Sequence, residues 1–165
     1  PTTCRRQRQM CIRDRLLAGV SLGHDVKYAT PEGMEPNVEV IERAEKIARQ
    51  TGAQITATND PSEAVTDAGV IYTDIFVSMG EEHMKDKFAA FEGFQVNEEL
   101  VSNANDNYLF MHCLPAHRGE EVTDAVIDSK NSIVFDQAEN RMWAQMSLLT
   151  YMCNPIAWNA YRDLY

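Results

Sequence analysis

The 165-residue sequence lacks several features that define whole classes of protein. Its apolar runs are only a few residues long, too short for a helix that crosses a bilayer, and no charged-then-apolar leader opens it. Its four cysteines are scattered, without a Cys-x-x-Cys pair, which argues against a zinc ribbon or a disulfide scaffold. We therefore expect a cytoplasmic protein with no membrane partner.

Positive charge is scarce after the first fifteen residues. The chain carries 15 Lys and Arg against 25 Asp and Glu, for a net charge of -10. Residues 1–15 hold five of the basic residues and one acid, which leaves 10 basic against 24 acidic residues in the rest. A body that acidic repels phosphate backbones, so no nucleic-acid partner is expected. The basic head differs from the rest of the chain, and we expect residues 1–15 to be disordered or foreign.

From Leu16 onward the pattern alternates between helix and strand. Runs typical of strands occur at residues 25–29, 55–58, 70–73, 108–112 and 132–135. Helices are indicated at residues 16–22, 37–51, from 60, at 120–127 and at 136–152. Strands joined by helical crossovers predict one doubly wound, parallel α/β sheet in a single domain. In such a sheet, the ligand binds beyond the carboxyl ends of the strands.

Polar side chains follow the strand predicted at residues 70–73. Asp74 comes directly after it, where its carboxylate would either hold a cationic ligand or cap the next segment. The turn that contains Ser78 and Met79 offers backbone amides to a carboxylate. Position alone does not decide between these interpretations.

The strand predicted at residues 108–112 ends in His-Cys-Leu-Pro. His112 and Cys113 are adjacent and point to opposite faces, so they are not by position a base and its nucleophile. Cys113 is either a reactive thiol beside a cation or a small buried apolar side chain. A cis bond before Pro115 would turn main-chain carbonyls toward a ligand.

Arg141 lies in the first turns of the last predicted helix. Its guanidinium would bind a phosphate or carbonyl oxygen through two hydrogen bonds, or pair on the surface with Asp136 or Glu139. No grouping of His, Cys and Asp has the spacing of metal ligands, so no metal is predicted.

Three stretches, taken together, resemble ornithine carbamoyltransferases. Residues 72–82, 110–124 and 134–141 follow the order and spacing of that family's second, ornithine-binding domain. Ser-Met-Gly together with His-Cys-Leu-Pro is specific, since aspartate carbamoyltransferases carry another motif in place of His-Cys-Leu-Pro. Putrescine carbamoyltransferases are expected to lack Ser-Met-Gly. The resemblance implies a Rossmann-like, ornithine-binding domain at residues 16–150, within a parent enzyme that is a homotrimer.

The activity implied by the resemblance is transfer of a carbamoyl group from carbamoyl phosphate to the side-chain amine of L-ornithine, which gives citrulline and phosphate. Asp74 would hold the ornithine amino groups, and Ser78 and Met79 would complete that pocket. Cys113 would lie against the attacking amine as its proton acceptor, with the nearby carboxylate as orienter.

The resemblance also implies which residues bind carbamoyl phosphate. These would be His112, Cys113, the Leu114 main chain and Arg141. Negative charge that develops on the carbamoyl oxygen would be stabilised by Arg141 and His112. Because phosphate is already a good leaving group, no cofactor is expected.

Parts of the family pattern have no counterpart in this sequence. They are the first domain, with its phosphate-binding loop, and the first strand of the second domain, with its Asn-containing turn. Residues 1–15 stand in place of that strand, and residues 151–165 match nothing in the family. We therefore expect a fragment whose sheet is open in the middle and which makes no citrulline alone.

Three other hypotheses stay open at this point. One is a non-catalytic amino-acid-binding or regulatory module. Another is a carbamoyltransferase for a different amine, such as putrescine. The third is cysteine-dependent hydrolysis, which rests on Cys113 alone.

Overall fold

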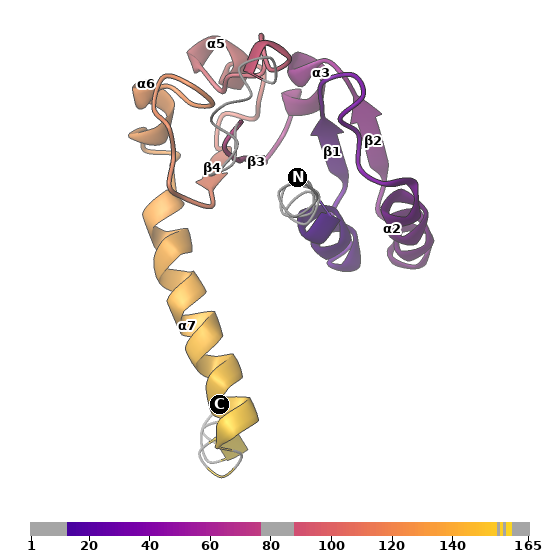
Figure 1. Ribbon diagram of the computed structural model, residues 1–165, viewed down its shortest axis with the longest axis vertical. Coiled ribbons are helices and arrows are strands. Elements are labelled where there is room, and N and C mark those ends of the chain that lie inside the picture. Colours follow the sequence, from indigo (N-terminus) through magenta and orange to yellow (C-terminus); the bar gives the residue numbers. More distant parts are fainter. Residues whose placement is uncertain (1–12, 77–87, 155, 157, 160–165) are drawn as a thin grey trace.

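The computed structural model describes residues 13–76, 88–154, 156, 158 and 159. Helices and short strands alternate along the chain, as predicted (Figure 1). After a helix at residues 13–21, the elements are β1 (Val26–Ala29), α2 (Val38–Thr51), β2 (Ile55–Thr58), α3 (Pro61–Val65), β3 (Val70–Thr73), α5 (Glu98–Val101), β4 (Leu109–His112), α6 (Asp124–Ile127) and α7 (Val134–Cys153).

The predicted helix ends are confirmed where local chemistry defines them. The Asn37 side chain accepts a hydrogen bond from the Glu39 amide and caps α2, and Gly52 ends that helix with a φ of 83°. Asp60 caps α3 in the same way, with Pro61 in its first turn. These ends need no tertiary contact, because donor and acceptor lie within a few residues of each other.

The strands are parallel, and they form two separate pairs. β1 pairs with β2, and β3 pairs with β4. Among the residues that the structure describes, no backbone pairing joins the two pairs. The parallel strands and the helices that alternate with them are those of the predicted α/β fold.

Two predictions for the C-terminal third were wrong in extent. Residues 132–135 do not form a strand: Ser132 makes one isolated parallel bridge with Phe110, and α7 begins at Val134, two residues early. The helix predicted at residues 120–127 starts only at Asp124, because Val122 is fully buried and takes part in isolated bridges.

The core consists of two clusters, one for each strand pair. The first surrounds β3 and β4, and its most buried members are Phe110, Val122, Val126 and Val134. The second joins Leu16 and Val20 of the helix at residues 13–21 to Ala44 and Ala48 of α2. Gly19 permits the close approach of that helix to β1, because a Cβ there would lie 2.6 Å from a methyl group of Val26.

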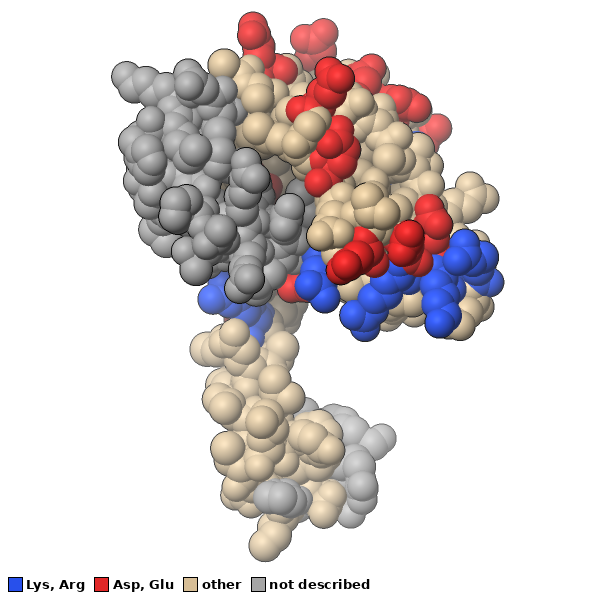
Figure 2. All heavy atoms as spheres, turned by 45° about the vertical axis from the view of Figure 1, so that its right-hand side comes forward, with Lys and Arg blue, Asp and Glu red and all other residues tan. Residues whose placement is uncertain are grey.

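Helix α7 extends away from both clusters (Figure 1). Only Val134, at its start, is buried. Residues 142–153 include no charged side chain, so the far end of this helix is uncoloured in Figure 2. None of the helices within the described part of the chain is both long and apolar enough to span a membrane.

Candidate active site

The carboxyl ends of β3 and β4 bring two predicted site residues together. Thr73 lies opposite His112 in the parallel register, so the next residue on each strand, Asp74 and Cys113, are also neighbours. The Cys113 thiol donates a hydrogen bond to Oδ1 of Asp74, with a Sγ–Oδ1 distance of 2.9 Å. Two residues that are 39 positions apart in sequence thus form one acid–thiol pair.

The two faces of this strand pair have different environments. Side chains alternate along a strand, so Phe110 and His112 point to one face and Cys113 to the other. Phe110 and His112 are 0% and 1% exposed, which identifies theirs as the core face. Asp74 and Cys113 are only partly buried. The acid–thiol pair therefore lies on the face opposite the core.

His112 holds the backbone of the loop after β4. Its Nδ1 accepts a hydrogen bond from the Leu114 amide at 2.9 Å, so in the neutral ring the proton lies on Nε2. Nε2 is 3.2 Å from Oε1 of Glu121, close to it without hydrogen-bond geometry, and both side chains are fully buried. Both ring nitrogens therefore face protein groups.

The loop that follows β4, from Cys113 to His117, has an unusual backbone conformation. The bond between Leu114 and Pro115 is cis, as the sequence analysis considered, and Leu114 has a φ of 49°. The carboxylate of Glu121 supports this loop from the core, since Oε1 also accepts from the His117 amide at 2.6 Å. Buried side chains thus hold the loop after Cys113 at the Leu114 amide and at the His117 amide.

The Cys113 thiol is protonated at neutral pH in this structure. Burial raises its pKa to about 11, and the hydrogen bond to Asp74 and the charge of that carboxylate act in the same direction. The guanidinium of Arg15 opposes these effects, since a nearby positive charge favours the thiolate. A cation at this position therefore makes it easier for the thiol to lose its proton, although burial has the larger effect.

Arg15 places such a cation in the site. Its two terminal nitrogens lie 3.4 and 3.3 Å from Oδ2 of Asp74. Its Cζ stands 3.7 Å from the ring centre of Tyr72. The helix at residues 13–21 thus runs across the boundary at residue 15 that the sequence analysis draws, and it delivers this side chain.

The first turn of α7 is attached to the same strand ends. Gln137 accepts a hydrogen bond from the His112 amide at 3.1 Å and donates one to the Tyr72 hydroxyl at 2.7 Å. Arg141 lies one helical turn further, on the same side of α7. It is exposed, and among the described residues it forms no ion pair with Asp136 or Glu139.

Ser78 and Met79 lie outside the residues that the structure describes. The structure thus brings Asp74, Cys113 and the Leu114 backbone together and turns the His112 side chain toward the core. Sequence reasoning missed Glu121, Tyr72 and Gln137. The alternation that places Tyr72 on the Asp74 side of β3 was a usable signal, whereas nothing local distinguishes Glu121 from Glu120.

Comparison with known proteins identifies the family. Residues 5–152 match the family described as aspartate/ornithine carbamoyltransferase, Asp/Orn binding domain. The chain belongs to this family.

Similar carbamoyltransferases, 36–56% identical to this chain, support the assignment. The catabolic ornithine carbamoyltransferase of Thermoplasma acidophilum is 56% identical over 135 residues, which are 81% of this chain and 44% of that protein. The solved ornithine carbamoyltransferase of Pyrococcus furiosus is 53% identical with a TM-score of 0.80, covering 84% of this chain and 44% of that one. The anabolic enzyme of Campylobacter jejuni superimposes with a TM-score of 0.81 at 36% identity, covering 87% and 48%.

The chain spans less than half the length of these carbamoyltransferases. The family match begins at residue 5 and ends at residue 152. It therefore includes most of the segment that the sequence analysis treats as a foreign head, and the boundaries at residues 15 and 150 stay predictions.

One group of side chains has the proximity needed for a metal ion. His117, Glu120 and Glu121 each offer a ligand atom, and these atoms lie within 4.8 Å of one another. The spacing of these residues along the sequence predicts no metal site. His117 Nδ1 is already 3.4 Å from a Glu120 oxygen, and Glu121 supports the loop after β4, so a metal would compete with both contacts.

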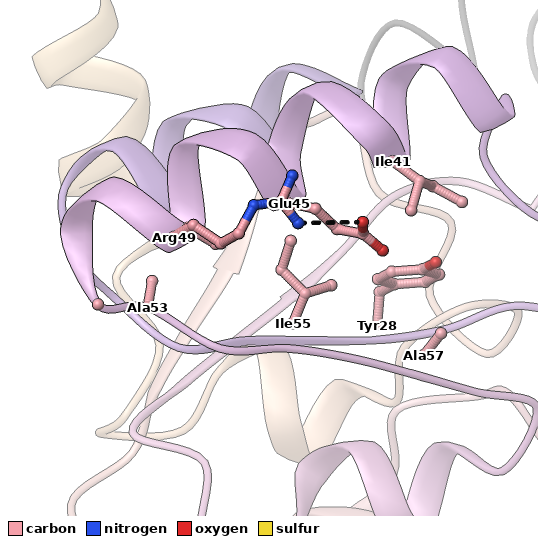
Figure 3. A pocket seen from close by; sticks show the side chains of 9 residues that line it. Tyr28, Ile41, Glu45, Arg49, Ala53, Ile55 and Ala57 are labelled. Carbon is pink, nitrogen blue, oxygen red and sulfur yellow. Dashed lines mark ion pairs between the residues drawn. The ribbon is translucent and has the colours of Figure 1, made fainter.

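A hollow of about 410 Å³ lies away from this candidate site, between α2 and the strands β1 and β2 (Figure 3). Its lining is mainly apolar, and the ion pair of Glu45 and Arg49 stands on its α2 side at 3.8 Å. None of the candidate site residues lines it.

Proposed function

We propose that this chain is the ornithine-binding part of an enzyme that transfers a carbamoyl group from carbamoyl phosphate to the side-chain amine of L-ornithine. The products would be citrulline and phosphate. The observation that carries the proposal is the Asp74–Cys113 pair at adjoining strand ends, in a chain more than 50% identical to ornithine carbamoyltransferases.

The acid–thiol pair suits the proton transfer that this reaction needs. An alkylammonium must lose a proton before it attacks a carbonyl carbon. Asp74 would bind the ammonium, whose positive charge lowers the pKa of the Cys113 thiol, as the Arg15 guanidinium does. With its pKa lowered, the thiol would give its proton to solvent. The Cys113 thiolate, lying against the amine, would then accept the ammonium proton while Asp74 orients the substrate.

The carbamoyl group would bind on the loop after β4. The Leu114 main chain and Arg141 are proposed to contact it, with Arg141 on the carbonyl oxygen or the phosphate. His112 would act by orienting Leu114, because both of its ring nitrogens face protein groups. Ser78 and Met79 stay in the proposal as the rest of the ornithine pocket.

The proposal extends to the protein that contains this chain. A parallel strand between β1 and β3 would complete a doubly wound, Rossmann-like sheet with the strand order of dinucleotide-binding domains. The complete enzyme is proposed to be a cytoplasmic homotrimer. The chain alone is proposed to make no citrulline, because the share of its relatives that it lacks would supply most contacts to carbamoyl phosphate.

Protection of Cys113 from alkylation tests the ornithine assignment. In a chain with Ser at the other three cysteines, iodoacetamide would modify Cys113 alone, and the rate would be followed by mass spectrometry with and without L-ornithine. We expect ornithine to slow the reaction in a saturable way. L-norvaline, which has the same carbon skeleton without the side-chain amine, should protect less.

The controls separate the pocket from general effects. Asp74→Asn should abolish protection while circular dichroism stays unchanged. Putrescine, which lacks the α-carboxylate, should protect less than ornithine if the amine of an amino acid is the substrate. Equal protection by norvaline and ornithine would refute the proposed role of Asp74.

A further inference from the structure

Tyr72 lies beside the acid–thiol pair but has no part in the mechanism above. It lies on β3, two residues before Asp74, which directly follows the strand, so the two side chains project from the same face of the strand pair. The ring is half-buried, and Cζ of the Arg15 guanidinium lies over it, 3.7 Å from the ring centre. The same guanidinium reaches Oδ2 of Asp74 at 3.3 Å.

One cation is therefore held by two different attractions at once. The carboxylate of Asp74 supplies the negative charge, and the face of the Tyr72 ring supplies the negative side of an aromatic quadrupole. A neutral group of the same shape would gain neither contribution. The geometry around Arg15 thus outlines a binding position for an organic cation.

Gln137 fixes the direction of this ring. The backbone amide of His112 can only donate, so it identifies the Gln137 atom that faces it as Oε1 and leaves Nε2 to donate to the Tyr72 hydroxyl. The ring is therefore anchored at its far end by α7, while its face stays turned toward the cation.

We propose that Tyr72 determines specificity for the cationic group of the substrate, and that Gln137 is a positioning residue that acts through Tyr72. The chemical class of the ligand is a compact organic cation, either a primary ammonium or a guanidinium. The identity of that ligand as ornithine rests on the function proposed above, whereas the cation position itself rests on the contacts of Arg15.

The first experiment measures cation binding by isothermal titration. Arg15→Ala removes the cation that the chain itself supplies, and L-ornithine, methylguanidinium and L-norvaline are then titrated into this variant. Tyr72→Leu, made in the same background, removes the aromatic face, and Tyr72→Phe keeps the face but loses the hydroxyl. We expect Tyr72→Leu to weaken binding of both cations by about 3- to 30-fold, and Tyr72→Phe to weaken it less.

A second measurement tests Gln137 by a readout that general loss of stability would not produce. Gln137→Leu removes a donor that stabilises the phenolate, so it should raise the pKa of Tyr72 further above its ordinary value. The titration is followed by absorbance near 295 nm, a conventional wavelength for tyrosinate, and Tyr72→Phe identifies which transition belongs to Tyr72. The loss of affinity in the double variant Tyr72→Phe/Gln137→Leu should be smaller than the two single losses combined.

The outcomes distinguish this inference from the proposed function. Ornithine affinity that is unchanged in Tyr72→Leu would overturn the inference and leave the ornithine assignment standing. Methylguanidinium binding that depends on Tyr72, without any binding of ornithine, would support the inference and overturn that assignment. Folded Arg15→Ala protein that binds neither cation would overturn both, and additive losses would overturn the positioning role of Gln137.

Discussion

The two strand pairs have the same length and direction, but the residues that follow their strands make different contacts. Each consists of two parallel strands of four residues. After β1 and β2, polar groups satisfy nearby backbone: Asn59 donates to the Thr30 carbonyl at 2.7 Å, and Asp60 caps α3. After β3 and β4, Asp74 also accepts from nearby backbone, the Ile75 amide at 2.9 Å, but it accepts in addition from the Cys113 thiol across the pair. Pairing of two parallel strands brings the residues that follow them close together, and the identity of those residues decides whether they form a candidate site.

Burial differs between the pairs as well. Phe110 of β4 is 0% exposed, whereas no residue of β1 or β2 is fully buried. The β3–β4 pair is thus the one that is covered on its core face. Substitutions in and around the two pairs test this difference, from the largest expected effect to the smallest.

The largest effect is expected in the core beneath the site. Phe110→Ala should lower the free energy of unfolding by about 3–5 kcal/mol, because it empties a large, fully buried volume. Val26→Ala in β1, which is partly buried, should cost only about 1 kcal/mol. Urea denaturation followed by circular dichroism measures both. Equal losses would contradict the difference between the pairs.

The support of the loop after β4 should depend on one of two adjacent glutamates. Glu121→Ala leaves the His117 amide without its acceptor and removes the carboxylate beside His112, at a cost of about 1–3 kcal/mol. Glu120→Ala is the matched control, because that side chain is 45% exposed, and it should change the stability by less than about 0.5 kcal/mol. Thermal unfolding of the two variants compares them. A stable Glu121→Ala variant would remove the basis for the supporting role.

The pH dependence of alkylation should separate the ends of the two pairs. Since Asp74 helps to raise the pKa of the Cys113 thiol to about 11, Asp74→Asn should lower that pKa and increase the thiolate fraction near pH 8. The midpoint of the iodoacetamide rate against pH should shift to lower pH. Asp60→Asn, at the end of β2, should leave the profile unchanged. An unshifted midpoint in Asp74→Asn would mean that Asp74 does not contribute to the raised pKa of the Cys113 thiol.

The smallest effect is expected on α7, outside both cores. Leu149 is 60% exposed, so Leu149→Ala should change the free energy of unfolding of the monomer by less than about 0.5 kcal/mol. Denaturation at low protein concentration, with the molar mass checked by light scattering, provides the measurement. A loss comparable to that of Phe110→Ala would show that the helix is packed against something in solution.

Local chemistry explains which parts of the fold could be predicted. The cap at Asn37, the end at Gly52 and the Asp60-Pro61 start each depend on neighbours within a few residues. The strand predicted at residues 132–135 does not form, because a short apolar run can be buried equally well in a helix or in a strand, and tertiary packing decides between them. There, Val134 is buried as the first residue of α7 rather than as part of a strand.

The candidate site was predicted in its residues more than in its geometry. Asp74 and Cys113 were placed correctly at strand ends, since each directly follows a recognisable run. The direction of the His112 side chain was not predicted, although the alternation of side chains along a strand already separated it from Cys113. The contacts of Tyr72 and Gln137 join residues 65 positions apart, and no local pattern indicates such a pair.

The sequence by itself determined the ends of the capped helices α2 and α3, which residues come after the strands of the β3–β4 pair, and the resemblance to ornithine carbamoyltransferases. Only the tertiary structure decided that Asp74 touches Cys113, that His112 faces Glu121, and that the thiol keeps its proton. The physical reason is that protonation and side-chain direction depend on burial and on charges brought close by strand pairing. These are properties of distance in space, which the order of residues along a chain does not record.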